Sequence, residues 1–163
     1  MFIFGIQKIA LLTLIPAFLS TSLIVSPVQN PQIAGNTEKK SPCRIEVSVA
    51  HLSTYLKEFK NTRAVKVNAD SICNKPLQNL TIYVEIHKKG WLNDHLVDTF
   101  QSSEYSYVAA NRKTIYEGAF VICKNLRSTE YYGIAYSRAL EDGIWEFAPK
   151  AKSIKTLPLR CGT

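Results

Sequence analysis

The sequence lacks the motifs that mark most catalytic and metal sites. Its neighbouring cysteines lie 30, 50 and 38 positions apart, so no C-x2-C pair is present to hold zinc. The segment His51-Leu52-Ser53 has no G-x-S-x-G turn, which is the usual setting of a serine nucleophile. Internal repeats, low-complexity tracts and a sustained helical period are also missing. These absences argue against a zinc module, a serine hydrolase and a helical fold.

Positive charge is in excess, but the sequence does not gather it into one stripe. The formal net charge is +7, and Lys8 near the N-terminus contributes one of these charges. Elsewhere the cations are scattered, apart from the pairs Lys39–Lys40, Lys88–Lys89 and Arg112–Lys113. Nucleic-acid-binding domains concentrate basic residues together with aromatic ones, so we expect no nucleic acid partner. The excess charge favours acidic surroundings, and the expected partner is an anionic cell-envelope component or another protein.

The first 25 residues have the pattern of a secretory signal. Lys8 precedes the uncharged apolar run Ile9–Val25, which Pro16 interrupts. A membrane-spanning helix needs about 20 consecutive apolar residues, so residues 1–25 are interpreted as a signal peptide. An uncleaved anchor stays open as the alternative, because the best small-x-small pair, Ser20 and Ser22, is a weak cleavage site. In either case the following domain lies outside the cell, secreted or tethered, and only the leader contacts the membrane.

The rest of the chain divides into a linker and one domain. Residues 26–42 are polar and contain prolines, as linkers do. Residues 43–163 hold all four cysteines, and an even number in a small exported domain predicts two disulfides. Cys43 opens the first expected strand and Cys73 closes the second, while Cys123 and Cys161 end two later strands. Antiparallel pairing of consecutive strands therefore favours Cys43–Cys73 and Cys123–Cys161 among the three connectivities.

Alternation of apolar and polar residues predicts strands throughout this domain. It is clearest in Cys43–Val49, Arg63–Cys73 and Leu80–His87. Residues 51–61 are expected to form a loop with at most a short helix. Seven or eight short strands predict an all-β, immunoglobulin-like two-sheet antiparallel sandwich. The five remaining strands are expected at His95–Phe100, Ser102–Ala110, Thr114–Cys123, Tyr131–Arg138 and Ser153–Cys161.

Three aromatic residues are candidates for contact with a partner. Trp91 follows a glycine turn, and Trp145 and Phe147 lie in the loop expected after Glu141-Asp142-Gly143. Exposed aromatic residues in loops serve partner, sugar or membrane contacts. The alternative is that they fold back over the open end of the sandwich.

The histidines give weaker signals. His87, Asp94 and His95 would need to converge to hold a metal ion, and surface residues beside a hairpin explain them equally well. His51 and Ser53 are expected to make local backbone hydrogen bonds. We therefore expect no catalytic residue, no metal and no cofactor.

The order of landmarks along the domain resembles that of small secreted four-cysteine proteins of actinobacteria. This resemblance implies an exported immunoglobulin-like fold with the same cysteine pairing, and it supplies neither an activity nor functional residues. The chain departs from that group in being richer in Lys and Ile and poorer in Gly and Thr. The matching landmarks are Cys43, His51, Ser53, Cys73, Gly90, Cys123, Tyr131–Tyr132–Gly133 and Cys161.

The leading hypothesis is an exported, non-enzymatic binding module that acts at or beyond the cell surface. Two alternatives stay open. One is a small secreted hydrolase that uses His51, or a metal-dependent enzyme that uses His87, Asp94 and His95. The other is a structural wall protein or an inhibitor.

Overall fold

Strands account for most of the structure, a computed structural model that describes residues 41–163. The expected signal peptide and most of the expected linker lie outside the described residues. Every strand pair is antiparallel, as the alternation predicts. None of the helical structure in residues 41–163 has the length and apolar character needed to cross a bilayer.

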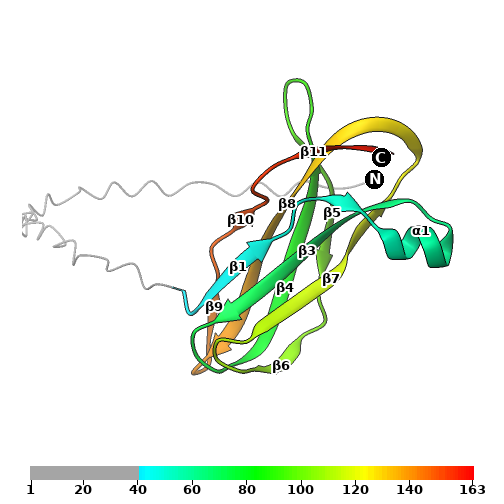
Figure 1. Cartoon of the computed structure of the whole chain (residues 1–163). Helices are drawn as coiled ribbons and strands as arrows, with labels where there is room; N and C mark the ends of the chain where they lie inside the picture. The colour runs from blue at the N-terminus through cyan, green and yellow to red at the C-terminus, as the bar shows by residue number, and fades with distance from the viewer. Residues whose placement is uncertain (1–40) are drawn as a thin grey trace, which may run out of the picture. The chain divides into compact units, whose positions relative to one another are not determined.

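The first sheet is built around one central strand, β3 (Figure 1). Strands β1 and β2 pair in succession along one edge of β3, and β7 pairs along the other. The four strands are β1 (Cys43–Val47), β2 (His51–Leu52), β3 (Ala64–Cys73) and β7 (Lys113–Ile122).

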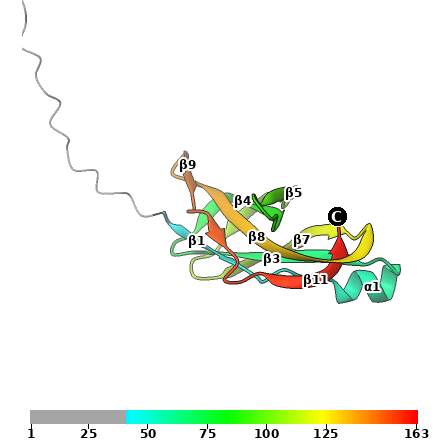
Figure 2. The ribbon, with the colours of Figure 1, turned by 90° about the horizontal axis from the view of Figure 1, so that it is seen from above.

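The second sheet is built around a central pair, β4 and β8. Strands β5 and β6 pair with the free edge of β4, while β9, β10 and β11 share the free edge of β8. In Figure 2, β4 and β5 lie on one side of the domain, and β3 and β7 lie on the other. The strands are β4 (Leu77–Lys88), β5 (His95–Gln101), β6 (Tyr105–Val108), β8 (Asn125–Glu141), β9 (Ile144–Phe147), β10 (Ala151–Lys152) and β11 (Leu157–Gly162).

The core lies between the two sheets. Where β3 and β8 face each other, β8 contributes small residues and β3 contributes larger ones. Inward positions of β8 carry small residues, among them Ala135, Ser137 and Ala139. Gly133 has no room for a side chain, because an added Cβ would collide with Val67 of β3. The apolar bulk of the core comes from branched residues of β3 and β4, which are Val65, Val67, Leu80, Ile82, Val84 and Ile86.

Both expected disulfides are confirmed. Cys43 and Cys73 are directly opposed in the β1–β3 pair, with their Cα atoms 4.0 Å apart. Cys123 follows β7 and joins Cys161 of β11, with 4.9 Å between the Cα atoms. The second bridge therefore ties the first sheet to the second.

Residues 51–61, where a loop with at most a short helix was expected, contain the helix α1 (Thr54–Lys60). Ser53 caps its first turn by accepting a hydrogen bond from the Leu56 N–H at 3.2 Å. Asn61 ends the helix in a left-handed conformation, with φ of 48°. No residue of α1 is buried, so the helix depends on its caps and flanking residues rather than on a packed face.

Two local expectations were incomplete. A regular strand at Thr114–Cys123 would turn every second residue toward the core. A bulge interrupts this alternation, because Val67 pairs with Ala119 while Ala69 pairs with Tyr116. The extra residue returns both Tyr116 and Val121 to the core side.

The loop expected after Glu141 is instead a tight hairpin that leads into β9. Asp142 and Gly143 both have positive φ values, 49° and 81°, which suit a two-residue hairpin turn. Trp145 and Phe147 therefore lie on a strand, and the expectation that they sit in a loop was wrong.

Removing the bridge between the sheets should cost more stability than any single surface change. Because the chain between Cys123 and Cys161 is long, with a separation of 38, the Cys123→Ala/Cys161→Ala variant is expected to lose about 3 kcal/mol of unfolding free energy. Denaturant unfolding of the oxidised protein measures this loss. Peptide mapping of the non-reduced protein provides the control, since a free thiol or a crossed pairing would contradict the framework.

Candidate functional site

The outward side of the second sheet carries aromatic rings and cations where a solvated sheet would carry small polar residues. The positions follow from the parity of β8: its inward residues from Gly133 to Ala139 are small, whereas Tyr132, Tyr136 and Arg138 have the opposite parity. We call this surface the aromatic face. It comprises Tyr83 and His87 of β4, Tyr132, Tyr136 and Arg138 of β8, Trp145 of β9, and Lys150 and Lys152 at β10.

One row of the aromatic face is a continuous stack of rings and cations. Tyr83 and Tyr136 are cross-strand partners whose rings stack at 4.8 Å, with 10° between their planes. The Arg138 guanidinium lies 5.7 Å from the Tyr83 ring and 4.7 Å from the Trp145 ring. At the other end, the Lys150 ammonium lies 5.0 Å from the Tyr136 ring. Cation–π attraction thus fixes both cations along the row.

A second row repeats this arrangement. His87 and Tyr132 are also cross-strand partners, and their rings stack at 5.1 Å. The Lys152 ammonium lies 3.8 Å from the centre of the Tyr132 ring. The Tyr132 hydroxyl donates a hydrogen bond to the Asp94 carboxylate at 2.9 Å. The face therefore continues to the connection between β4 and β5.

One carboxylate, Glu85, lies among these side chains, and its contacts with them favour its ionised form. It accepts hydrogen bonds from Lys150 at 2.7 Å and is 3.0 Å from the His87 ring nitrogen. Partial burial raises the pKa of Glu85, but the contacts with Lys150 and His87 outweigh burial and leave the pKa below its ordinary value. The hydrogen bond to Glu85 also raises the pKa of Lys150. Both groups are therefore ionised at neutral pH.

The contact between Tyr132 and Asp94 shifts the pKa values of both groups. Burial and the Asp94 carboxylate together raise the pKa of Tyr132 to about 12. The same hydrogen bond, with support from Lys89 and Lys152, lowers the pKa of Asp94. This pair holds its proton on the tyrosine across the physiological range.

The geometry of the rings determines what the face can bind. Because Tyr83 and Tyr136 stack across neighbouring strands, their planes are perpendicular to the sheet and their edges point outward. Ring edges carry partial positive charge, while the ring faces are already occupied by each other or by cations. The Nε atom of Arg138 is buried, and its guanidinium group lies against the Tyr83 and Trp145 rings. The surface offered to a ligand is apolar with positive character.

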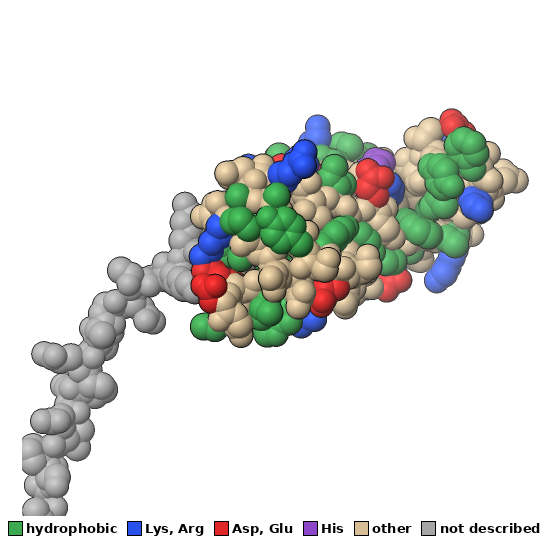
Figure 3. All heavy atoms as spheres, turned by 90° about the horizontal axis from the view of Figure 1, so that it is seen from below, with side chains coloured by type: hydrophobic (Ala, Val, Ile, Leu, Met, Phe, Trp, Pro, Cys, Tyr) green, Lys and Arg blue, Asp and Glu red, His purple; other side chains and the backbone are tan. Residues whose placement is uncertain are grey.

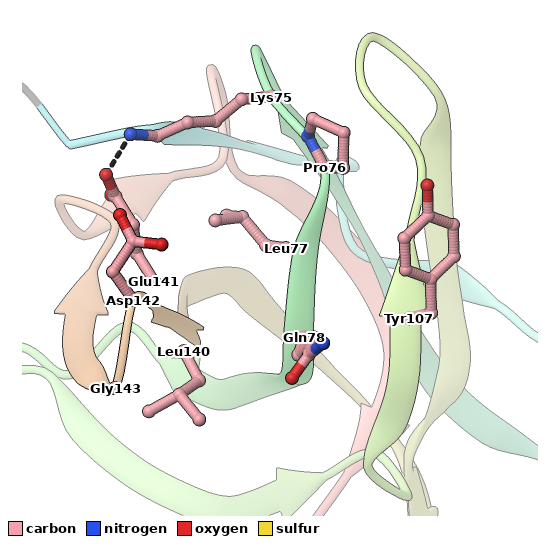
Figure 4. A pocket seen from close by; sticks show the side chains of 9 residues that line it. All are labelled: Lys75, Pro76, Leu77, Gln78, Tyr107, Leu140, Glu141, Asp142 and Gly143. Atoms are coloured by element: carbon pink, nitrogen blue, oxygen red, sulfur yellow. Dashed lines mark hydrogen bonds and ion pairs between the residues drawn. The ribbon is translucent and has the colours of Figure 1, made fainter.

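A hollow adjoins the aromatic face where β8 turns into β9 (Figure 4). Leu140 lines this hollow and is also the cross-strand partner of Trp145. Figure 4 shows the Lys75 ammonium bonded to Glu141 on one side and Tyr107 on the other. A ligand along the aromatic face can therefore reach an ammonium group and a further tyrosine.

The residues considered for metal binding or catalysis do not converge. His87 and Asp94 contact Glu85 and Tyr132 respectively. Within the described part of the chain, no group of three or more His, Cys, Asp or Glu side chains is arranged to hold a metal ion. His51 bonds to the Val49 carbonyl at 3.0 Å and Ser53 caps α1, so both make the local hydrogen bonds expected of them.

The three aromatic candidates are all solvent-accessible but belong to different surfaces. Trp145 is 40% exposed and Phe147 is 58% exposed, and both lie on β9 beside the aromatic face. Trp91 is 97% exposed in the β4–β5 connection. They therefore do not form one loop cluster.

A third apolar surface lies on α1. Tyr55 and Phe59 are 60% and 71% exposed, and their rings lie 5.0 Å apart. In Figure 3 the end of the domain that carries α1, at the right, shows hydrophobic side chains beside a few charged ones. This surface has no fixed cation over its rings among the described contacts, unlike the aromatic face.

Sequence reasoning missed most of the aromatic face. Tyr132 and Tyr136 were expected on one parity of a strand, but nothing in the sequence assigned that parity to the outside. The useful signal was the opposite parity, where Gly133, Ala135 and Ser137 are all small. The partners Tyr83 and Lys150 could be found only from the strand register.

The high pKa of Tyr132 gives a test of this local geometry. An unfolded tyrosine releases its proton near pH ~10, so between about pH 9 and 11 the folded state binds more protons than the unfolded state. The free energy of unfolding therefore falls as pH rises, by about 1 kcal/mol more in the wild type than in Tyr132→Phe. Denaturant unfolding at the two pH values measures the difference. Equal losses in both proteins would show that Tyr132 is not protected.

No family model matches the chain. The search of curated proteins also gives no match. The aromatic face is therefore the basis for assigning a function.

Proposed function

We propose that the protein is an exported, non-enzymatic binding module that holds an anionic cell-envelope component on the aromatic face. The observation that carries the proposal is the row Trp145–Arg138–Tyr83–Tyr136–Lys150 on a solvent-facing sheet. Trp, Tyr and Arg are the residues most enriched among those that dominate binding energy at interfaces.

The disulfides support the compartment in this proposal. All four cysteines are paired, and disulfides persist mainly in oxidising environments. Export through residues 1–25, followed by release or by retention as an anchor, supplies such an environment. Secretion is the part of the proposal that the signal-like sequence supports.

The strand order supports an immunoglobulin-like arrangement within the proposal. One sheet has β1 and β7 on either side of β3, and the other has β5, β4, β8 and β11 in succession. Immunoglobulin-like domains have strands A, B, E and D in one sheet and C, F and G in the other. Strands β1, β3 and β7 correspond to A, B and E, and β4, β8 and β11 correspond to C, F and G, whereas β5 pairs with β4 rather than joining the first sheet. Such domains often bind through one sheet or its loops.

The charge of the face selects the class of partner. Lys152, Arg138 and Lys150 are each held over rings, and Lys150 is also bonded to the Glu85 carboxylate. The chain as a whole has a net charge of +7, so long-range attraction also favours an acidic ligand. An extended anionic polymer would lie along the row from Trp145 to Lys150.

The test uses Trp145, which closes the row and is partly exposed. In co-sedimentation with a washed cell-envelope fraction, Trp145→Ala is expected to reduce affinity about 30-fold, as loss of a central aromatic contact does. Added salt should weaken wild-type binding, because the attraction is partly electrostatic.

The matched control is Phe59→Ala, which removes an exposed ring from α1. It should bind as the wild type does, and thermal unfolding should show that both variants are folded. Absence of retention on any envelope fraction, or equal loss in both variants, would refute the proposal.

A further inference from the structure

The connection between β4 and β5 carries the most exposed apolar pair that the structure describes next to a group of cations. Trp91 is 97% exposed and Leu92 is 80% exposed. In Figure 1 this connection is the green loop that projects beyond the strands at the top of the domain. Adjacent large apolar side chains in full contact with water indicate a contact surface rather than a folding requirement.

The base of this hairpin is fixed, so its tip is held in a defined position. The Lys89 N–H donates to the Glu130 carbonyl of β8 at 2.9 Å. Asp94 accepts the Tyr132 hydroxyl on the other side of the loop. Gly90 has no room for a side chain, because an added Cβ would collide with the Asn93 carbonyl. The apolar pair is therefore presented by a constrained loop.

Cations from separate parts of the chain surround a hollow at the base of the hairpin. Lys88 and Lys89 come from the hairpin, and Arg127 comes from the start of β8. Glu130 also lines the hollow, and its carboxylate accepts a hydrogen bond from Thr156 at 2.9 Å. Positive charge therefore predominates directly behind the apolar tip.

We infer that the β4–β5 hairpin binds the surface of an anionic lipid bilayer. Trp91 and Leu92 enter the boundary between headgroups and acyl chains, where tryptophan is favoured because its ring is apolar and its N–H is polar. Lys89 and Arg127 contact the phosphate groups of the headgroups, as basic residues beside membranes do. This contact uses a different surface from the aromatic face and does not depend on the proposed function.

The apolar tip is what distinguishes a bilayer from a soluble polyanion. A soluble polymer would need the cations of the hollow but would leave Trp91 and Leu92 in water. Only a partner with an apolar interior beneath a charged surface removes both side chains from water while it neutralises the cations. The observed order, with apolar residues at the tip and cations at the base, matches the depth profile of a bilayer.

The experiment uses residues 38–163, which contain both disulfides and every strand pair and form one compact unit. This choice excludes the apolar segment Ile9–Val25, which would bind lipid by itself. The probes are vesicles of phosphatidylglycerol mixed with phosphatidylcholine, and vesicles of phosphatidylcholine alone. The domain is expected to sediment with the first and not with the second.

Tryptophan emission locates the contact. In a Trp145→Phe variant, Trp91 is the sole tryptophan, and its emission should shift to shorter wavelength and be quenched by brominated lipid when anionic vesicles are added. Trp91→Ser and Leu92→Ser should each weaken vesicle binding at least tenfold. Vesicle-bound protein with an unshifted Trp91 spectrum would overturn the inference.

A charge-matched pair of variants separates a local site from general attraction. The Lys89→Gln/Arg127→Gln variant should bind anionic vesicles about 30-fold more weakly, because each cation near an anionic surface contributes about 1 kcal/mol of binding free energy. The Arg44→Gln/Lys113→Gln variant has the same net charge but changes exposed cations of the first sheet, and it should bind nearly as the wild type does. Equal loss in both variants would overturn the inference.

Two further outcomes decide between ligand classes. Failure to bind anionic vesicles would overturn the bilayer contact and leave envelope binding through Trp145 unaffected. Binding of polyphosphate with the same affinity in the wild type and in Trp91→Ser, together with weak vesicle binding, would assign the hollow to soluble polyanions instead.

Discussion

The close approach of β8 to β3 is the constraint on which the rest of the domain depends. A Cβ atom on Gly133 would collide with Val67, so the inner side of β8 accepts only small residues at this level. Ala135, Ser137 and Ala139 extend that pattern along the strand. Because alternate residues of a strand face opposite sides, Tyr132, Tyr136 and Arg138 lie on the outer side of β8. Tyr131, two residues before Gly133 and on its parity, is buried in the core. The aromatic face is therefore a consequence of how the core packs.

The same strand connects the two surfaces to which we assign functions. Tyr132 stacks on His87 in the aromatic face, and its hydroxyl bonds to Asp94 at the base of the β4–β5 hairpin. Trp145 pairs with the far end of β8 through Leu140. A single long strand, Asn125–Glu141, thus sets the positions of rings and of the hairpin without any movable element between them.

Much of the fold could be predicted because strand parity and cysteine order are local properties of the sequence. Alternation located the main strands, and antiparallel pairing placed Cys43 opposite Cys73. The bulge between Tyr116 and Ala119 and the strand β9 were missed, because each depends on which partner strand is already in place. Asp142-Gly143 is a recognised hairpin signal, but the length of the strand that follows depends on pairing with β8. The candidate site was harder for the same reason, since Tyr83 and Tyr136 become neighbours only through register.

Scattered cations in a sequence do not exclude charged sites in the folded domain. Lys88–Lys89 gives no more than a pair along the chain, yet Arg127 of a different strand lines the same hollow. On the aromatic face, Arg138 is 12 positions before Lys150, and both lie over rings of one row. A net charge of +7 is therefore not only a matter of solubility. Some of the cations lie over aromatic rings, on the face that we propose binds an extended ligand, and others lie behind an apolar tip that we propose contacts a lipid surface.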